Sequence, residues 1–141
     1  MNTRIEHDLL GDMELPADTW YGIQTQRAVD NFAITGVPIS HFPALVNALA
    51  MVKAAAARAN HELGLLPAHK AEAILAACTD IIGGRLHEAF VVDLIQGGAG
   101  TSTNMNANEV IANLALEKLG QPRGAYAHLH PNDDVNMSQS T

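Results

Sequence analysis

Apolar positions recur at helical spacing along most of the chain. One stripe, with members three or four residues apart, predicts a helix over about 44–63, and Gly64 is placed to end it. The members of this stripe are Leu45, Leu49, Val52, Ala56 and Ala59. A second helix is predicted from Pro67 to about Ile82, with Cys78 on its apolar side and two glycines after it. Long amphipathic helices therefore make up the middle of the chain.

Shorter elements precede and follow these helices. Residues 4–8 and 12–15 read as a small β-hairpin that turns at Gly11, and a short helix is predicted over 23–31. Residues 87–96 fit a turn of helix followed by extended chain. The fold class is therefore mainly α with a small β element near the start, in a single domain over 1–141.

The last part of the chain is predicted to contain two more helical segments. One follows the glycine-rich stretch and runs to about Leu119, where Gly120 and Pro122 end it. Asn132 or Asp133 could cap one further short helix.

Composition narrows the class of protein. Apolar residues make up 48% and charged residues 16%, which indicates a globular rather than a disordered chain. The net charge is −7 and the few Lys and Arg are scattered, so the sequence gives no support for nucleic-acid binding. No apolar run is long enough to span a membrane, and the start shows no hydrophobic signal region. Cys78 is the only cysteine, which excludes an internal disulfide. We expect a cytoplasmic protein.

The stretch "GGAGTSTNMNANEV", residues 97–110, carries the candidate chemistry. A helix start has free N–H groups and the positive end of the helix dipole, and small residues before it allow an anion to approach. The hydroxyls of Thr101, Ser102 and Thr103 can donate further hydrogen bonds, and no lysine or arginine is close in the sequence. This pattern favours a small carboxylate bound by neutral donors. The alternative is that the hydroxyls only cap the helix. A Walker loop would need a lysine, and a dinucleotide loop would need a third glycine.

Other polar residues have mainly structural interpretations. Asn104, Asn106, Asn108 and Glu109 are unusual at a helix start, and we expect their side chains to tie neighbouring segments together. His128, His130, Asp133 and Asp134 could suggest a metal, but Pro131 and the helix cap favour a structural loop. We predict no metal site, and Cys78 is predicted to be a core residue.

Three segments resemble the aspartase/fumarase superfamily. These are "TWYGIQTQRAVDNFAITG", "GGAGTSTNMNANEVIAN" and "HPNDDVNMSQST", which occur in the family's order, and the resemblance extends over nearly all of the chain. Within the superfamily, "IQGGAGTS" and "SQST" are more similar to the aspartate ammonia-lyases than to the fumarases. The resemblance therefore implies reversible deamination of L-aspartate to fumarate and ammonia, by the N-terminal helical domain of a lyase.

The resemblance also implies site residues and partners. By motif match, the hydroxyls of Thr101, Ser140 and Thr141 bind the β-carboxylate of a small dicarboxylate or amino-acid substrate. Family members are homotetramers whose active sites combine three chains, and no cofactor is implied. The family's catalytic serine lies on a loop of the type Gly-Ser-Ser-x-Met-Pro-x-Lys-x-Asn, which has no match here. No catalytic residue is thus expected within these residues, and this chain alone is predicted to be inactive. The family's central helical bundle and C-terminal domain are expected to lie outside it.

A second carboxylate site is implied for some members of the superfamily. Here it maps to His130, Asn132 and Asp133, and an aspartate, Asp134, stands where the family usually has histidine. We expect this extra carboxylate to disfavour an anion. Two other interpretations of the chain remain open, namely a domain of a class II fumarate hydratase and a non-catalytic helical interaction module.

Overall fold

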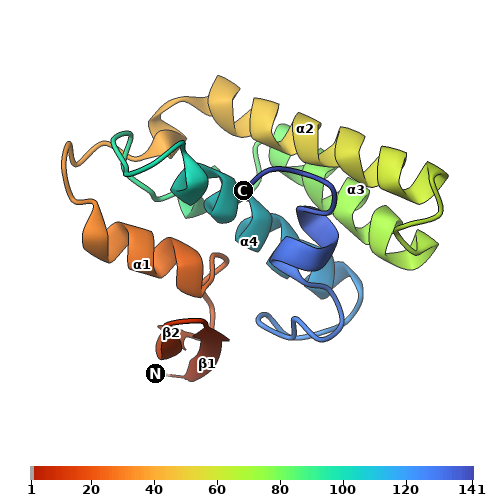
Figure 1. Ribbon diagram of the computed structural model, residues 1–141, viewed down its shortest axis with the longest axis horizontal. Helices are drawn as coiled ribbons and strands as arrows, with labels where there is room; N and C mark the ends of the chain where they lie inside the picture. The colour runs from red at the N-terminus through yellow and green to blue at the C-terminus, as the bar shows by residue number, and fades with distance from the viewer. Residues whose placement is uncertain (1) are drawn as a thin grey trace.

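The computed structural model describes residues 2–141 and shows a mainly helical fold with an N-terminal hairpin (Figure 1). The hairpin strands are β1 (Thr3–Asp8) and β2 (Gly11–Pro16). The long helices are α1 (Ile23–Asn31), α2 (Pro43–Glu62), α3 (Ala68–Ile82) and α4 (Thr101–Lys118). Single turns of helix are η1 (Ile39–His41), η2 (His87–Ala89) and η3 (Pro131–Val135). The predicted fold class is confirmed, and the predicted helix bounds agree to within one or two residues.

The hairpin pairs in antiparallel register from Thr3 opposite Pro16 to Asp8 opposite Gly11. The turn itself is formed by Leu9 and Leu10, and Gly11 follows with φ +113°. Gly11 was predicted as the turn residue. It is instead the first residue of the second strand, where a positive φ favours glycine.

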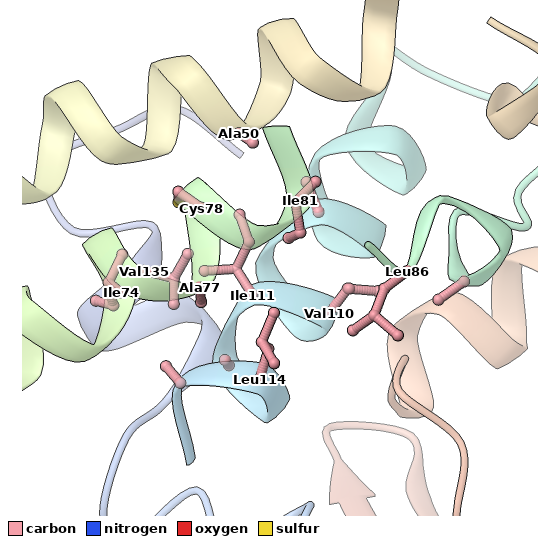
Figure 2. Packing of buried hydrophobic residues seen from close by; sticks show 14 of the residues in the cluster. Ala50, Ile74, Ala77, Cys78, Ile81, Leu86, Val110, Ile111, Leu114 and Val135 are labelled. Carbon is pink, nitrogen blue, oxygen red and sulfur yellow. The ribbon is translucent and has the colours of Figure 1, made fainter. Parts of the chain in front are cut away.

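Helix α4 is the centre of the molecule. Every residue from Met105 to Leu116 is buried, because α1, α2, α3 and η3 all contact this helix. Val110, Ile111 and Leu114 of α4 belong to the same apolar cluster as Ile74, Ala77, Cys78 and Ile81 of α3 (Figure 2). Cys78 lies in this core with no exposed surface, as predicted, and burial raises its thiol pKa to about 12. A neutral thiol of this kind is chemically inert.

Helix α2 buries a different face from the apolar stripe that predicted it. Its buried residues are Val46, Ala50, Lys53, Ala57 and Asn60. Leu45 and Val52 of the predicted stripe are 39% and 58% exposed. Alanines occur on nearly every side of this helix, so the sequence offers two stripes one residue apart. The buried stripe includes Ala50 and Ala57, whose small side chains allow close approach of the α2 and α3 backbones.

The outer face of α2 therefore presents apolar surface. Leu45, Met51 and Val52 are all more than a third exposed, whereas Val110 and Leu114, which could also have formed such a surface, are fully buried. We expect the isolated chain to self-associate and to bind a hydrophobic dye, because contiguous apolar patches are unusual on monomers. A Leu45→Gln/Val52→Gln variant should lose both properties. The matched control is Leu9→Gln, which changes an exposed leucine of the hairpin turn. Sedimentation of the unaltered chain as a strict monomer, without dye binding, would contradict this expectation.

None of the helices among residues 2–141 is long and apolar enough to cross a membrane.

Candidate functional site

The glycine-rich loop leads into α4 through two residues with positive φ. Gly98 has φ +72° and Gly100, which is the N-cap residue, has φ +89°. The N-cap residue is a glycine and has no side chain that could cap the helix. The N–H of Thr103 instead donates to Oε1 of Gln96 at 2.8 Å, and the Thr103 hydroxyl accepts from Nε2 of the same glutamine at 2.7 Å. Thr103 is thus engaged by the loop, and the hydroxyl of Thr101 is not a helix cap.

The fold brings the three predicted carboxylate-binding residues together. The C-terminal segment runs back to the start of α4 (Figure 1), and Oγ1 of Thr101 donates to the carbonyl oxygen of Thr141 at 3.0 Å. Nδ2 of Asn104 donates to the carbonyl oxygen of Ser140 at 3.5 Å. Thr101, Ser140 and Thr141 are all exposed. The backbone of the exposed residues Ser140 and Thr141 therefore lies beside the start of α4, where Thr101 is also exposed.

A buried lysine, Lys53, lies next to the segment that carries Ser140 and Thr141. Nζ of Lys53 donates to Oδ1 of Asn104 at 2.6 Å, Oδ1 of Asn136 at 2.8 Å and Oε1 of Gln139 at 2.9 Å. Lys53 is only 2% exposed, and burial lowers its pKa to about 8. From the sequence we expected no cation near the glycine-rich loop. This expectation was wrong, because Lys53 contacts Asn104 at the start of α4. The available signal was a lysine within the stripe Val46, Ala50, Ala57.

Asn136 is the centre of the polar network. Its Oδ1 accepts from Lys53, from Nδ2 of Asn104 at 3.0 Å and from Nδ2 of Asn108 at 3.1 Å. Asn106 connects a different segment: its Oδ1 accepts from the N–H of Val91 at 2.8 Å and its Nδ2 donates to Ala89. The predicted role of these asparagines in tying segments together is confirmed.

A cavity of about 300 Å³ opens beside Ser140. Its polar lining comes from Lys53, Asn104, Gln139 and Ser140, and its apolar lining comes from the outer side of α2. Space for a small ligand is therefore continuous with one of the predicted substrate-binding residues and with the buried lysine.

The residues of the predicted second carboxylate site are largely engaged with one another. Nδ1 of His130 accepts from the N–H of Asn132 at 3.0 Å and from the N–H of Asp133 at 3.3 Å. His130 is therefore the cap of η3, in place of the predicted Asn132 or Asp133. A histidine ring nitrogen can accept these bonds when it is unprotonated. An anion at this site would compete with His130 for these N–H groups.

The carboxylate of Asp134 forms its hydrogen bonds within the protein. It is buried and accepts two hydrogen bonds from Nζ of Lys70, at 2.9 and 3.0 Å, and one from the N–H of His130 at 2.7 Å. We expected the Asp134 carboxylate to disfavour an anion by its charge. The ion pair with Lys70 largely neutralises that charge.

A cavity of about 340 Å³ adjoins His130 and Asn132, whereas Asp133 is exposed and does not line it. No lysine or arginine is among its lining residues, which include the carboxyl groups of Asp8 and Glu109. Burial and the charge of Glu6 raise the pKa of Glu109 to about 8. Arg27 pairs with the Asp8 carboxylate, so the lining leaves little uncompensated negative charge near pH 7. The second carboxylate site stays a prediction.

The buried carboxyl groups of Glu6 and Glu109 cap helix α1. The N–H of Ile23 donates to Oε2 of Glu6 at 2.8 Å, and the N–H of Gln24 donates to Oε1 of Glu109 at 2.9 Å. Carboxyl oxygens at a helix N-terminus accept hydrogen bonds from N–H groups that have no partner within the helix. Glu109 thus connects the central helix to the N-terminal segment, as was expected of it.

Within residues 2–141, no three His, Cys, Asp or Glu side chains are grouped in a way that could bind a metal ion.

A family model described as "Lyase" matches residues 11–141 of the chain. The chain belongs to this lyase family, the aspartase/fumarase superfamily. Among curated superfamily members, it is 66% identical to an aspartate ammonia-lyase of Pseudomonas aeruginosa over 99% of this chain and 30% of that protein. It is 52% identical to an aspartate ammonia-lyase of Escherichia coli, again over 99% and 30%. The chain thus spans about a third of the length of the superfamily members that it matches.

Solved structures of the superfamily agree with the fold. A fumarate lyase:delta crystallin from Brucella melitensis has a TM-score of 0.97 at 65% identity, over 99% of this chain and 31% of that one. A class II fumarase from Schistosoma mansoni has a TM-score of 0.86 at 35% identity, over 99% and 29%. The chain is therefore more similar to these aspartate ammonia-lyases than to this fumarase.

Proposed function

We propose that the chain is the N-terminal domain of an aspartate ammonia-lyase and contributes hydroxyl donors for the β-carboxylate of L-aspartate. The observation that carries this proposal is the meeting of Thr101 with the 140–141 segment at one exposed place. The 66% identity to an aspartate ammonia-lyase, against 35% to a fumarase, supports aspartate rather than malate as substrate.

The proposed chemistry explains why hydroxyl groups suit this position. A base removes a proton from the carbon next to the β-carboxylate, and the electron pair spreads into that carboxylate to give an aci-carboxylate dianion. The C–N bond then breaks, ammonia leaves, and fumarate remains. Hydrogen-bond donors fixed in advance stabilise the dianion more than the ground state and so lower the barrier.

In our proposal, the base that removes this proton is not among residues 1–141. The superfamily's serine loop has no match in the chain, so the full-length protein must supply it, and the active site is expected to combine chains of a homotetramer. Substrate binding by this domain is thus one part of a shared site.

Assays of the full-length protein with L-aspartate and with L-malate test the proposal. We expect fumarate and ammonia to form from aspartate, little fumarate to form from malate, and the 141-residue chain alone to be silent with both. A full-length protein that dehydrates malate and ignores aspartate would establish the fumarase alternative. A protein that neither reacts with nor binds a dicarboxylate would favour the interaction module.

A further inference from the structure

Lys53 is a buried cation without an anionic partner. Its three hydrogen-bond acceptors are the neutral amide oxygens of Asn104, Asn136 and Gln139. No ion pair involves Lys53 among residues 2–141. An unpaired ammonium in a protein interior is unfavourable, and buried charges are usually paired. The arrangement therefore lacks a negative charge that would balance it.

The side-chain amides of Asn104 and Gln139 connect Lys53 to the segment that carries Ser140 and Thr141. Asn104 accepts from Lys53 through its oxygen and donates from Nδ2 to Asn136 and to the Ser140 carbonyl. Gln139 likewise accepts through Oε1 and donates from Nε2 to the carbonyls of Val135 and Met137. A single ammonium thus fixes the orientation of side chains on α4 and on the segment that carries Ser140 and Thr141.

We propose that Lys53 is a positioning residue and the buried counter-charge of the substrate carboxylate site. Lys53 and Ser140 line the same cavity, so an anion there would lie close to the ammonium. The charge attracts the dicarboxylate, and the hydrogen bonds keep the 136–140 segment against the first turns of α4. This inference rests on the proposed function, because it concerns the same carboxylate site.

The inference predicts how binding depends on pH. The elements around Lys53 present neutral amides from α4 and from the 136–139 segment, and the titratable group that acts on it is Cys78 of α3, which stays neutral to about pH 12. Above about pH 8 Lys53 loses its proton and the site loses its positive charge. A bound dianion favours the charged lysine, so by linkage the affinity for a dianion is full below pH 8 and falls above it.

Succinate binding to the full-length enzyme tests this, measured by calorimetry between pH 7 and pH 9 at constant ionic strength. Succinate has no amino group and is a dianion throughout this range, since free carboxyl groups titrate near pH 4. If only the charged form of Lys53 binds, Kd should rise about tenfold across this range. A change of less than twofold would overturn the inference.

Lys53→Met tests the assignment to this residue. The variant should bind succinate at least about tenfold more weakly at pH 7, because a charge near the ligand acts through an effective dielectric constant of about 20. Its Kd should not change between pH 7 and pH 9. The control is Lys118→Met, at the other end of α4, which should behave as the unaltered enzyme. A folded Lys53→Met enzyme that keeps the pH dependence would contradict our assignment. If the variant does not fold, the pH dependence of the unaltered enzyme decides.

The two proposals fail in different ways. Loss of the pH dependence with intact succinate binding overturns only the role of Lys53. Absence of fumarate production from aspartate overturns the proposed reaction, and absence of any succinate binding overturns both.

Discussion

Thr101→Val in the full-length enzyme is expected to lower kcat/KM for L-aspartate by about 10- to 150-fold while leaving the fold intact. Valine nearly matches the shape of threonine but removes the hydroxyl donor. A hydrogen bond to a charged group contributes roughly 1.5–3 kcal/mol, and this range sets the expected loss. If the donor acts mainly on the aci-carboxylate, kcat should fall together with kcat/KM.

Stability distinguishes this role from a structural one. The Thr101 hydroxyl donates to the Thr141 carbonyl and does not cap α4, so the melting temperature should change little. Loss of a helix cap would instead lower stability by roughly 0.5–2 kcal/mol and leave the kinetics normal. Thr79→Val, an identical change on the exposed side of α3, is the matched control. Normal kinetics in Thr101→Val would remove this residue from the site.

Gly22→Ala is expected to destabilise the protein by about 3 kcal/mol or more, because it overfills a closed polar cluster. A Cβ atom at Gly22 would lie 2.5 Å from Oε2 of Glu109 and 2.6 Å from both Oε2 of Glu6 and the Tyr126 hydroxyl. The carboxyl groups cannot move away freely, since each accepts an N–H at the start of α1. Chemical denaturation measures the effect.

Gly64→Ala is the control for this prediction. Gly64 has φ +75° but nothing within 4 Å of an added Cβ, so it should cost only about 1–2 kcal/mol through backbone strain. Gly22 has an extended φ of −120°, so its substitution reports contact rather than backbone strain. Equal losses of stability in the two variants would show that the cluster adapts to a methyl group.

The sequence predicted the elements well because their ends carry strong local signals. Gly64, Gly83 and Gly120 follow helices α2, α3 and α4, and the helical spacing of apolar residues within these helices is clear. It could not identify the buried face of α2, because that face contains Lys53 and Asn60 and is less apolar than the neighbouring stripe that stays exposed. The cap of η3 was also missed, because histidine is not among the usual capping residues.

The candidate site was predictable in part. Motif resemblance singled out Thr101, Ser140 and Thr141, and the fold brings them together. Lys53 could not be placed at the site, because it is 51 positions from Asn104 along the chain and reaches it only through helix packing. Its partners are amides rather than carboxylates, so no pattern of opposite charges in the sequence indicated the contact.

A structure of the full-length protein with succinate bound tests the central claim most directly. We predict that one carboxylate accepts hydrogen bonds from the hydroxyls of Thr101, Ser140 and Thr141, at about 2.5–3.0 Å. Succinate bound only in the cavity beside His130 and Glu109, with these hydroxyls free of ligand, would contradict the claim.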